Sequence, residues 1–194
     1  MTRTRSVGIL VFEDVEVLDF CGPFEVFSVT GRQIAPGTFT VFTVGNVAGP
    51  VLARNGLSVN PQYTLADAPP IDLLLIPGGQ GTRPLMHDAS LLDWIGRRAA
   101  TAELVLSVCT GALLLAKAGL LKDLQATTHH AAHGLLREVA PGTTVRDDVR
   151  YVDNGRVITS AGVAAGIDMS FHVVDRLLGS ETATAAARYI DYPW

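Results

Sequence analysis

A cysteine, Cys109, stands at the junction of two different patterns in this sequence. The segment Glu103–Val108 before it is rich in Val and Leu, and Gly111–Ala118 after it is rich in Leu and Ala, which predicts a buried strand followed by a helix. The small residues Ser107 and Gly111 flank it at the spacing of the nucleophile elbow G-x-S-x-G. Cys109 is therefore a candidate nucleophile, and the alternative is a buried cysteine that packs as a small apolar residue. The following helix is expected to lower the thiol pKa and favour thiolate.

Two glycines, Gly78 and Gly79, directly follow another apolar run, Asp72–Pro77. Their backbone amides could turn toward the same cleft and, with the amide of Thr110, form an oxyanion-type hole. Ordinary turn glycines are the alternative. The spacing matches neither the dinucleotide-binding fingerprint nor the P-loop, so no nucleotide site is indicated.

An acid, Asp19, lies among apolar residues just before Gly22 and Pro23. It could cap a helix that Pro23 begins, or place a carboxyl in the cleft. In the cleft, burial and a nearby thiolate would raise its pKa and keep it protonated as a general acid. Glu25, on the same predicted helix, is a second candidate acid.

His129 and His133 are four residues apart, a spacing that could hold a metal on one helix face. No Glu follows His129 as in H-E-x-x-H, and no third ligand is evident, so we expect no metal site. Asp168 and His172, also four apart, are expected to form a local pair on their helix.

The elements that must position these residues alternate along the chain. Four short apolar runs are predicted to form strands buried on both faces: Ser6–Phe12, Phe39–Val44, Asp72–Pro77 and Glu103–Val108. The predicted helices are Pro23–Thr30, Ala89–Thr101, Gly111–Ala118, His130–Val139 and Ala165–Leu178. This alternation predicts an α/β fold with a doubly wound, mostly parallel sheet and helices on both faces. The pairs Asn55-Gly56 and Asn154-Gly155 predict two hairpins.

Composition narrows the class of protein. With 194 residues, 48% hydrophobic and 18% charged, the chain is expected to form a single domain over residues 1–194. The net charge of −4 and the lack of a Lys/Arg-rich run argue against nucleic acid as a partner. Acidic residues interrupt the first apolar run too early for a signal peptide, and no run is long enough to span a membrane. Two cysteines without a disulfide framework indicate the cytoplasm.

Five segments, in order, resemble the ThiJ/PfpI family of the class I glutamine amidotransferase-like superfamily. They are VGILVFEDVEVLDFCGPFEVF, LLLIPGGQG, LVLSVCTGALLLAKAGLL, ATTHH and VITSAGVAAGIDMSFHVV. The resemblance implies a flavodoxin-like fold, usually a homodimer, with Cys109 as the nucleophile on the elbow. It also implies that Asp19 is the acidic partner of the cysteine, that Thr110 is the residue after it and that Gly79 is a backbone donor.

Within the family, the Cys-Thr-Gly sequence and the ATTH and SAGVAAGID segments look like the branch that holds isonitrile hydratase and domains of AraC-type regulators. That branch implies hydration of an isonitrile to an N-substituted formamide through a cysteine thioimidate, with Asp19 as acid and base and without a cofactor. The alternatives are a glyoxalase or deglycase, an amidase, or a non-catalytic domain that senses a small molecule or an oxidant.

Two positions depart from the family pattern. Cys21 stands where a small or hydroxyl residue is expected, and if it faces Cys109, hydrogen peroxide could join the two through a sulfenic acid. His130 replaces the aromatic residue that commonly follows TTH, and it could form a base–thiol dyad with Cys109.

Overall fold

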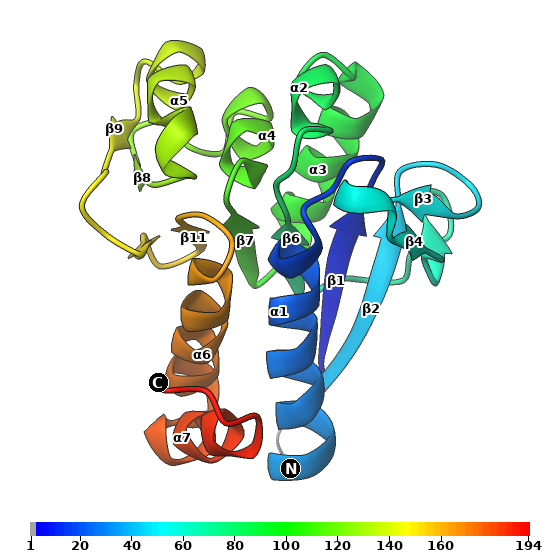
Figure 1. Ribbon diagram of the computed structural model, residues 1–194, viewed down its shortest axis with the longest axis vertical. Coiled ribbons are helices and arrows are strands. Elements are labelled where there is room, and N and C mark those ends of the chain that lie inside the picture. Colours follow the sequence, from blue (N-terminus) through cyan, green and yellow to red (C-terminus); the bar gives the residue numbers. More distant parts are fainter. Residues whose placement is uncertain (1–2) are drawn as a thin grey trace.

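A computed structural model describes residues 3–194, and its central feature is a seven-stranded sheet in the order β10-β11-β7-β6-β1-β2-β5 (Figure 1). The strands are β1 (Arg5–Val11), β2 (Phe39–Gly45), β5 (Tyr63–Thr64), β6 (Leu73–Ile76), β7 (Leu104–Val108), β10 (Tyr151–Asp153) and β11 (Val157–Ser160). Every pairing in this sheet is parallel except that of β10 with β11. The predicted doubly wound, mostly parallel sheet is confirmed.

Helices follow most of the strands. They are α1 (Val17–Val29), α2 (Thr82–Leu85), α3 (Ala89–Thr101), α4 (Gly111–Lys117), α5 (His133–Val139), α6 (Ala165–Leu178) and α7 (Ser180–Tyr189). α1 and α6 pack side by side (Figure 1). All residues of β6 and β7 are buried, as expected for strands covered on both faces. Within residues 3–194, no helix has the length and apolar character needed to cross a membrane.

Two helix predictions need correction. The first helix begins at Val17, six residues before Pro23, because Asp19, Phe20 and Gly22 are buried as part of its core-facing side. Pro23 lies inside this helix, so tertiary packing outweighs the preference of proline for a helix start. The segment predicted as one helix from His130 divides into a 3₁₀ turn, η3 (His130–Ala132), and α5.

Both predicted hairpins are confirmed. Asn55 and Gly56 connect the antiparallel strands β3 (Val51–Leu52) and β4 (Ser58–Val59) within the 3₁₀ turn η2 (Arg54–Gly56). Asn154 and Gly155 connect β10 to β11. The remaining elements are a π-helical turn, η1 (Thr30–Ile34), and a small parallel pair, β8 (Gln125–Ala126) and β9 (Thr144–Val145).

The strand order fixes where a ligand site can form. β1 pairs with β2 on one side and with β6 on the other, so the chain winds outward from β1 in two directions. In open α/β sheets, ligands bind beyond the carboxyl ends of the strands at this switch point. The loops after β1, β6 and β7 meet at this end of the sheet, which carries Asp19, Gly78 and Cys109.

Candidate active site

Cys109 lies on a strained turn between β7 and α4. Its φ is 56°, in the left-handed region that residues other than glycine rarely adopt. The backbone N–H of Cys109 donates to the carbonyls of Ser160 (3.2 Å) and Ala161 (3.0 Å), and the Thr128 hydroxyl donates to the Cys109 carbonyl at 2.7 Å. The side chain is buried, with 5% of the residue exposed. Hydrogen bonds on both sides of the residue thus hold the strained conformation that turns the thiol out of the strand.

Gly111 lets α4 begin directly against the end of β6. A Cβ atom on this residue would lie 2.0 Å from the carbonyl oxygen of Ile76, well inside contact distance. Only a glycine permits this approach, which brings the first turn of α4 to the loop that carries Gly78. The glycine that suggested an elbow in the sequence therefore has a definite packing role.

Asp19 is a fully buried carboxyl in the first turns of α1. Its Oδ2 atom accepts a hydrogen bond from the Gly78 N–H at 2.9 Å, whereas its Oδ1 atom has no hydrogen-bond partner within residues 3–194. Glu16, rather than Asp19, occupies the N-cap position, and no side chain caps this helix, so the capping alternative is wrong. Asp19 is a buried carboxyl with one oxygen left for a proton or a substrate.

The Thr110 hydroxyl connects the elbow to the glycine loop. Its Oγ1 accepts from the Gly79 N–H at 3.0 Å and contacts the Thr82 hydroxyl at 3.2 Å. The amides of Gly78 and Gly79 therefore both donate to side chains of the site. The oxyanion-type hole expected from these two amides is not formed in this arrangement, in which they fix Asp19 and Thr110 instead. A Cβ on Gly78 would lie 2.5 Å from the Thr110 nitrogen and 2.8 Å from Asp19 Oδ2.

Burial raises the pKa of both Cys109 and Asp19. Burial, together with the negative charge of Asp19, raises the pKa of the Cys109 thiol to about 12, although the backbone amides of Thr110 and Val163 partly oppose this. The expected lowering of this pKa at a helix start is therefore wrong, because desolvation outweighs the helix. Burial raises the pKa of Asp19 to about 7, as expected, and the negative charge of Glu16 adds to the rise. The hydrogen bonds from Gly78 and Cys109 oppose it, so the expected contribution of a neighbouring thiolate is wrong. Above neutral pH the pair thus holds one proton.

A second strained residue, Val163, borders the thiol. Its φ is 48°, an outlier for a β-branched side chain, and it lies in the loop between β11 and α6. Its backbone amide lowers the pKa of both Cys109 and Asp19. The sequence offered only the segment SAGVAAGID as a signal, and Val163 itself was not predicted as a site residue.

The thiol opens into a cleft of about 230 Å³. Besides Cys109, Thr110, Gly79 and Val163, the cleft is lined by Glu16, Arg54, Gln80, Arg83 and His129. These last five were not predicted as site residues. The histidine in the cleft is His129 rather than His130, whose ring lies against that of His129 with the centroids 4.1 Å apart.

His129 is arranged as a hydrogen-bond donor. Burial and the positive charges of His130 and Arg83 lower its pKa, so the ring is neutral at pH 7. The Ala131 N–H donates to Nδ1 at 3.2 Å, which assigns the ring proton to Nε2. A ring in this form cannot accept the thiol proton at Nε2. His129 therefore does not take the place of His130 in a base–thiol dyad with Cys109.

The predicted metal spacing does not place two histidines on one helix. His129 precedes η3, while His133 begins α5 and its Nε2 atom lies 3.1 Å from the Thr128 carbonyl. Within residues 3–194, no three His, Cys, Asp or Glu side chains are grouped as metal ligands.

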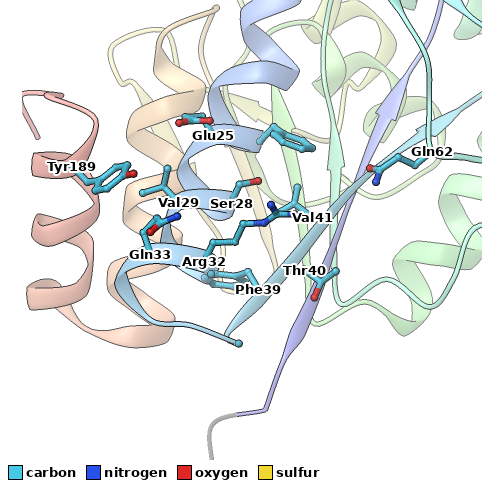
Figure 2. Close-up of a pocket in the computed structure, with 13 residues that line it drawn as sticks. Glu25, Ser28, Val29, Arg32, Gln33, Phe39, Thr40, Val41, Gln62 and Tyr189 are labelled. Carbon is cyan, nitrogen blue, oxygen red and sulfur yellow. The ribbon is translucent and has the colours of Figure 1, made fainter.

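Three other sequence hypotheses concern residues outside the cleft. Glu25 lines a separate cavity of about 650 Å³ between α1, β2 and α7, with Arg32 and Tyr189 (Figure 2). Cys21 is a half-buried free thiol that does not line the Cys109 cleft.

The local pair predicted between Asp168 and His172 is wrong. His172 hydrogen-bonds to Asp153 at 2.8 Å, and Asp168 pairs with Arg150 and Tyr192. Partners in β10, in the residue before it and in the C-terminal segment thus replace the helix neighbour.

Comparison with known proteins identifies relatives over nearly the whole chain. Residues 5–176 match the DJ-1/PfpI family. Isonitrile hydratase of Pseudomonas putida is 38% identical over 188 residues, which cover 96% of this chain and 78% of that protein. The HTH-type transcriptional regulator CdhR of Pseudomonas aeruginosa is 34% identical over 181 residues, which cover 93% of this chain and 53% of the regulator. This chain therefore spans about half the length of that regulator.

A solved structure supports the same assignment at the level of the fold. The crystal structure of a ThiJ/PfpI family protein from Pseudomonas syringae superposes with a TM-score of 0.89 at 29% identity, covering 100% of this chain and 77% of the other. The reported relatives thus include an enzyme and a transcriptional regulator.

Proposed function

The chain belongs to the DJ-1/PfpI family, and from that premise we propose that it is an isonitrile hydratase that works through Cys109 and Asp19. The observation that carries the proposal is the buried pairing of a thiol with a carboxyl, and not with a basic histidine. The 38% identity with an isonitrile hydratase over 96% of the chain adds support. The similarity to regulators makes a non-catalytic role the principal competitor.

The first step forms a covalent adduct. The terminal carbon of an isonitrile, R–N≡C, accepts a proton and a nucleophile at the same atom. Asp19 takes the thiol proton of Cys109 and passes it to this carbon while the sulfur adds. The S–H bond breaks and C–H and C–S bonds form, which gives the thioimidate R–N=CH–S–Cys. The Thr110 and Val163 amides, which favour the charged sulfur, stabilise the thiolate as it develops.

The second step hydrolyses the adduct. Asp19, now a carboxylate, takes a proton from a water molecule whose oxygen attacks the thioimidate carbon. The C–S bond then breaks, the nitrogen gains a proton and the sulfur leaves as the thiol, so that the product is R–NH–CHO. All atoms of the formamide come from the isonitrile and water, and the scheme uses no cofactor.

The geometry favours this scheme over an amidase. An amidase of the cysteine type needs a base that accepts the thiol proton, usually a histidine. His129 is neutral with its Nδ1 occupied by the Ala131 N–H, so Asp19 is the available base. A glyoxalase or deglycase would use the same Cys109 to form a hemithioacetal with a carbonyl substrate.

The test is formamide production from a simple alkyl isonitrile by the native protein and by Cys109→Ala, Asp19→Ala and Cys21→Ser variants. We expect loss of at least about a thousandfold for the first two, since each removes a group that acts in both steps. Cys21→Ser is the matched control and should retain activity, because this thiol lies outside the cleft. No formamide, with D-lactate from methylglyoxal instead, would favour the carbonyl reaction, and ligand binding without turnover would favour a sensor.

A further inference from the structure

Among the cleft residues that take no part in the reaction proposed above, three are arginine or histidine side chains with N–H donors. They are Arg54 in η2, Arg83 in α2 and His129 just before η3. Three separate elements therefore bring donors to one small cavity that also contains Cys109. The only acidic side chain that lines the cavity with them, among the residues described, is Glu16.

Arg83 is held in place at the edge of this cavity. Its Nη1 atom donates to the Gly79 carbonyl at 3.0 Å and to the Thr82 hydroxyl at 3.1 Å. Throughout residues 3–194, no carboxylate lies within ion-pair distance of this guanidinium, although seven other arginine–carboxylate pairs are formed. A positioned guanidinium with Nε and Nη2 still available can bind a carboxylate through two parallel hydrogen bonds.

The positive charge of Arg54 is only weakly balanced by a carboxylate. Its Nε atom lies 4.0 Å from Glu16 Oε2, at the limit of an ion pair, and both side chains are partly exposed. The two arginines therefore bring two positive charges against one negative charge on Glu16. His129 adds a neutral Nε2–H donor. One net positive charge at the cavity edge fits a singly charged ligand better than a doubly charged one.

We infer that the cleft selects isonitriles that carry a carboxylate a few bonds from the reacting carbon, with Arg83 as its main partner and Arg54 and His129 as additional donors. The isonitrile part of this inference rests on the proposed function, whereas the anion site does not. Because the cavity measures only about 230 Å³ and contains both Arg83 and Cys109, the substrate must be short. These three residues act on specificity and positioning, since Cys109 and Asp19 perform the chemistry.

A matched pair of substrates tests the complete inference. Isocyanoacetate and isocyanoacetamide have nearly the same size, and only the first is charged. Hydration of isocyanoacetate consumes one water and yields N-formylglycine. We expect kcat/KM for the acid to exceed that for the amide by at least tenfold, and this ratio to fall to near one in Arg83→Gln. The ratio should not change in Arg97→Gln, since Arg97 is an exposed residue of α3 outside the cleft.

A second experiment tests the anion site without relying on turnover. Cys109 in the native protein is alkylated with iodoacetate or iodoacetamide, which also differ mainly in charge, and peptide mass mapping follows each thiol. Cys21 is the internal reference because it lies outside the cleft. We expect the iodoacetate-to-iodoacetamide rate ratio to be at least tenfold higher at Cys109 than at Cys21. Arg83→Gln should abolish this difference, while Arg83→Lys should retain part of it.

The outcomes separate the two proposals. Equal ratios at Cys109 and Cys21 in the native protein overturn the anion site, whatever the hydration assay gives. A higher ratio at Cys109 without formamide from either isonitrile supports the anion site and contradicts the hydratase. Formamide from both substrates at equal kcat/KM supports the hydratase and overturns the selection of carboxylates.

Discussion

At the scale of single residues, the chemistry depends on how Cys109 and Asp19 share a proton. Each is buried, which raises both pKa values, and the negative charge of Asp19 raises the pKa of Cys109 further, so only one of them is charged at a time over a wide pH range. The form with one proton can exist as thiol and carboxylate or as thiolate and carboxylic acid. The same pair can therefore supply a nucleophile and a proton donor together, which is what addition to an isonitrile carbon requires.

The pH dependence of the rate follows from this pair. Below neutral pH both groups are protonated, and no base is present to accept the thiol proton. We expect kcat/KM for formamide production to rise about tenfold per pH unit up to about pH 7, the pKa of Asp19, and then to level off, since Cys109 titrates only near 12. Initial rates with a neutral isonitrile, which does not titrate, measure this profile.

The control for this profile is Asp19→Asn, which should lose both the rise and the activity. A profile that falls between pH 6 and pH 8 would contradict the shared-proton form. So would a profile that stays flat there, because Asp19 would then not titrate in the reactive pair.

The sequence identified some site residues and missed others for a physical reason. Cys109 follows a recognisable strand-to-helix pattern, and Asp19 is conspicuous as an acid in an apolar segment. Arg54 and Arg83 have no such local signal, because the cleft is assembled from segments that are distant in the sequence. His129 was considered only as a metal ligand, because its spacing from His133 does not indicate the cleft. The pKa of Cys109 was misjudged because the sequence does not show how deeply the elbow is buried.

At the scale of elements, the contact between α4 and β6 determines the position of the elbow. α4 begins at Gly111, where the backbone is packed against the carbonyl of Ile76. Any side chain there must push the helix away from the strand. The amide of Thr110 and the thiol of Cys109 would move with it, so the packing of one glycine is linked to the geometry of the site.

Gly111→Ala should therefore destabilise the protein and disturb the site. The added Cβ would lie 2.0 Å from the Ile76 oxygen, and we expect the free energy of unfolding to fall by about 3 kcal/mol or more, since backbone must shift. Gly96→Ala in α3 is the matched control, because a Cβ there meets nothing within 4 Å. It should stabilise the protein by up to about 1 kcal/mol, as alanine favours a helix. Urea unfolding of both variants measures these changes in stability. A stable, fully active Gly111→Ala variant would contradict the link between the packing of this glycine and the geometry of the site.

The boundaries of elements were predicted well where the apolar pattern was strong. β7 and α3 have the predicted limits within one residue, because their apolar positions agree with their burial. α1 was predicted too short because Pro23 is a typical first helical residue, whereas here the buried side chains around it extend the helix. In α1, which carries Asp19, tertiary packing therefore determines where the helix begins more strongly than local sequence preference does.

At the scale of the whole molecule, the sheet order explains why distant loops form one site. The reversal of winding at β1 opens a crevice between the loops after β1 and β6, and the β7 loop adjoins it. The alternation of apolar runs predicted a doubly wound, mostly parallel sheet and a site at the carboxyl ends of its strands, but not the order of the strands. The side chains that complete the cleft from η2 and α2 depend on how the hairpin and the short helix pack, which no periodicity encodes.

Burial of Asp19 also affects the stability of the whole molecule. A carboxyl whose pKa is raised from 3.8 to about 7 on folding stabilises the native state only while it is protonated. Below about pH 4 the carboxyl is protonated in both the folded and the unfolded state, and its full contribution to stability is present. Between pH 4 and pH 7 the unfolded chain ionises first, so this contribution falls as the pH rises, by about 1.4 kcal/mol per pH unit and about 4 kcal/mol in total.

The comparison with Asp19→Asn isolates this effect between pH 4 and pH 7, because Cys109, whose pKa depends on the charge of Asp19, stays protonated over this range. We expect the free energy of unfolding of the native protein, relative to the variant, to decrease steadily from pH 4 to pH 7 and to stay constant above it. Urea unfolding at several pH values measures the difference. If the native protein instead gained stability over this range relative to Asp19→Asn, the carboxyl would be stabilised in its charged form, and it could not serve as the proton donor to the isonitrile carbon.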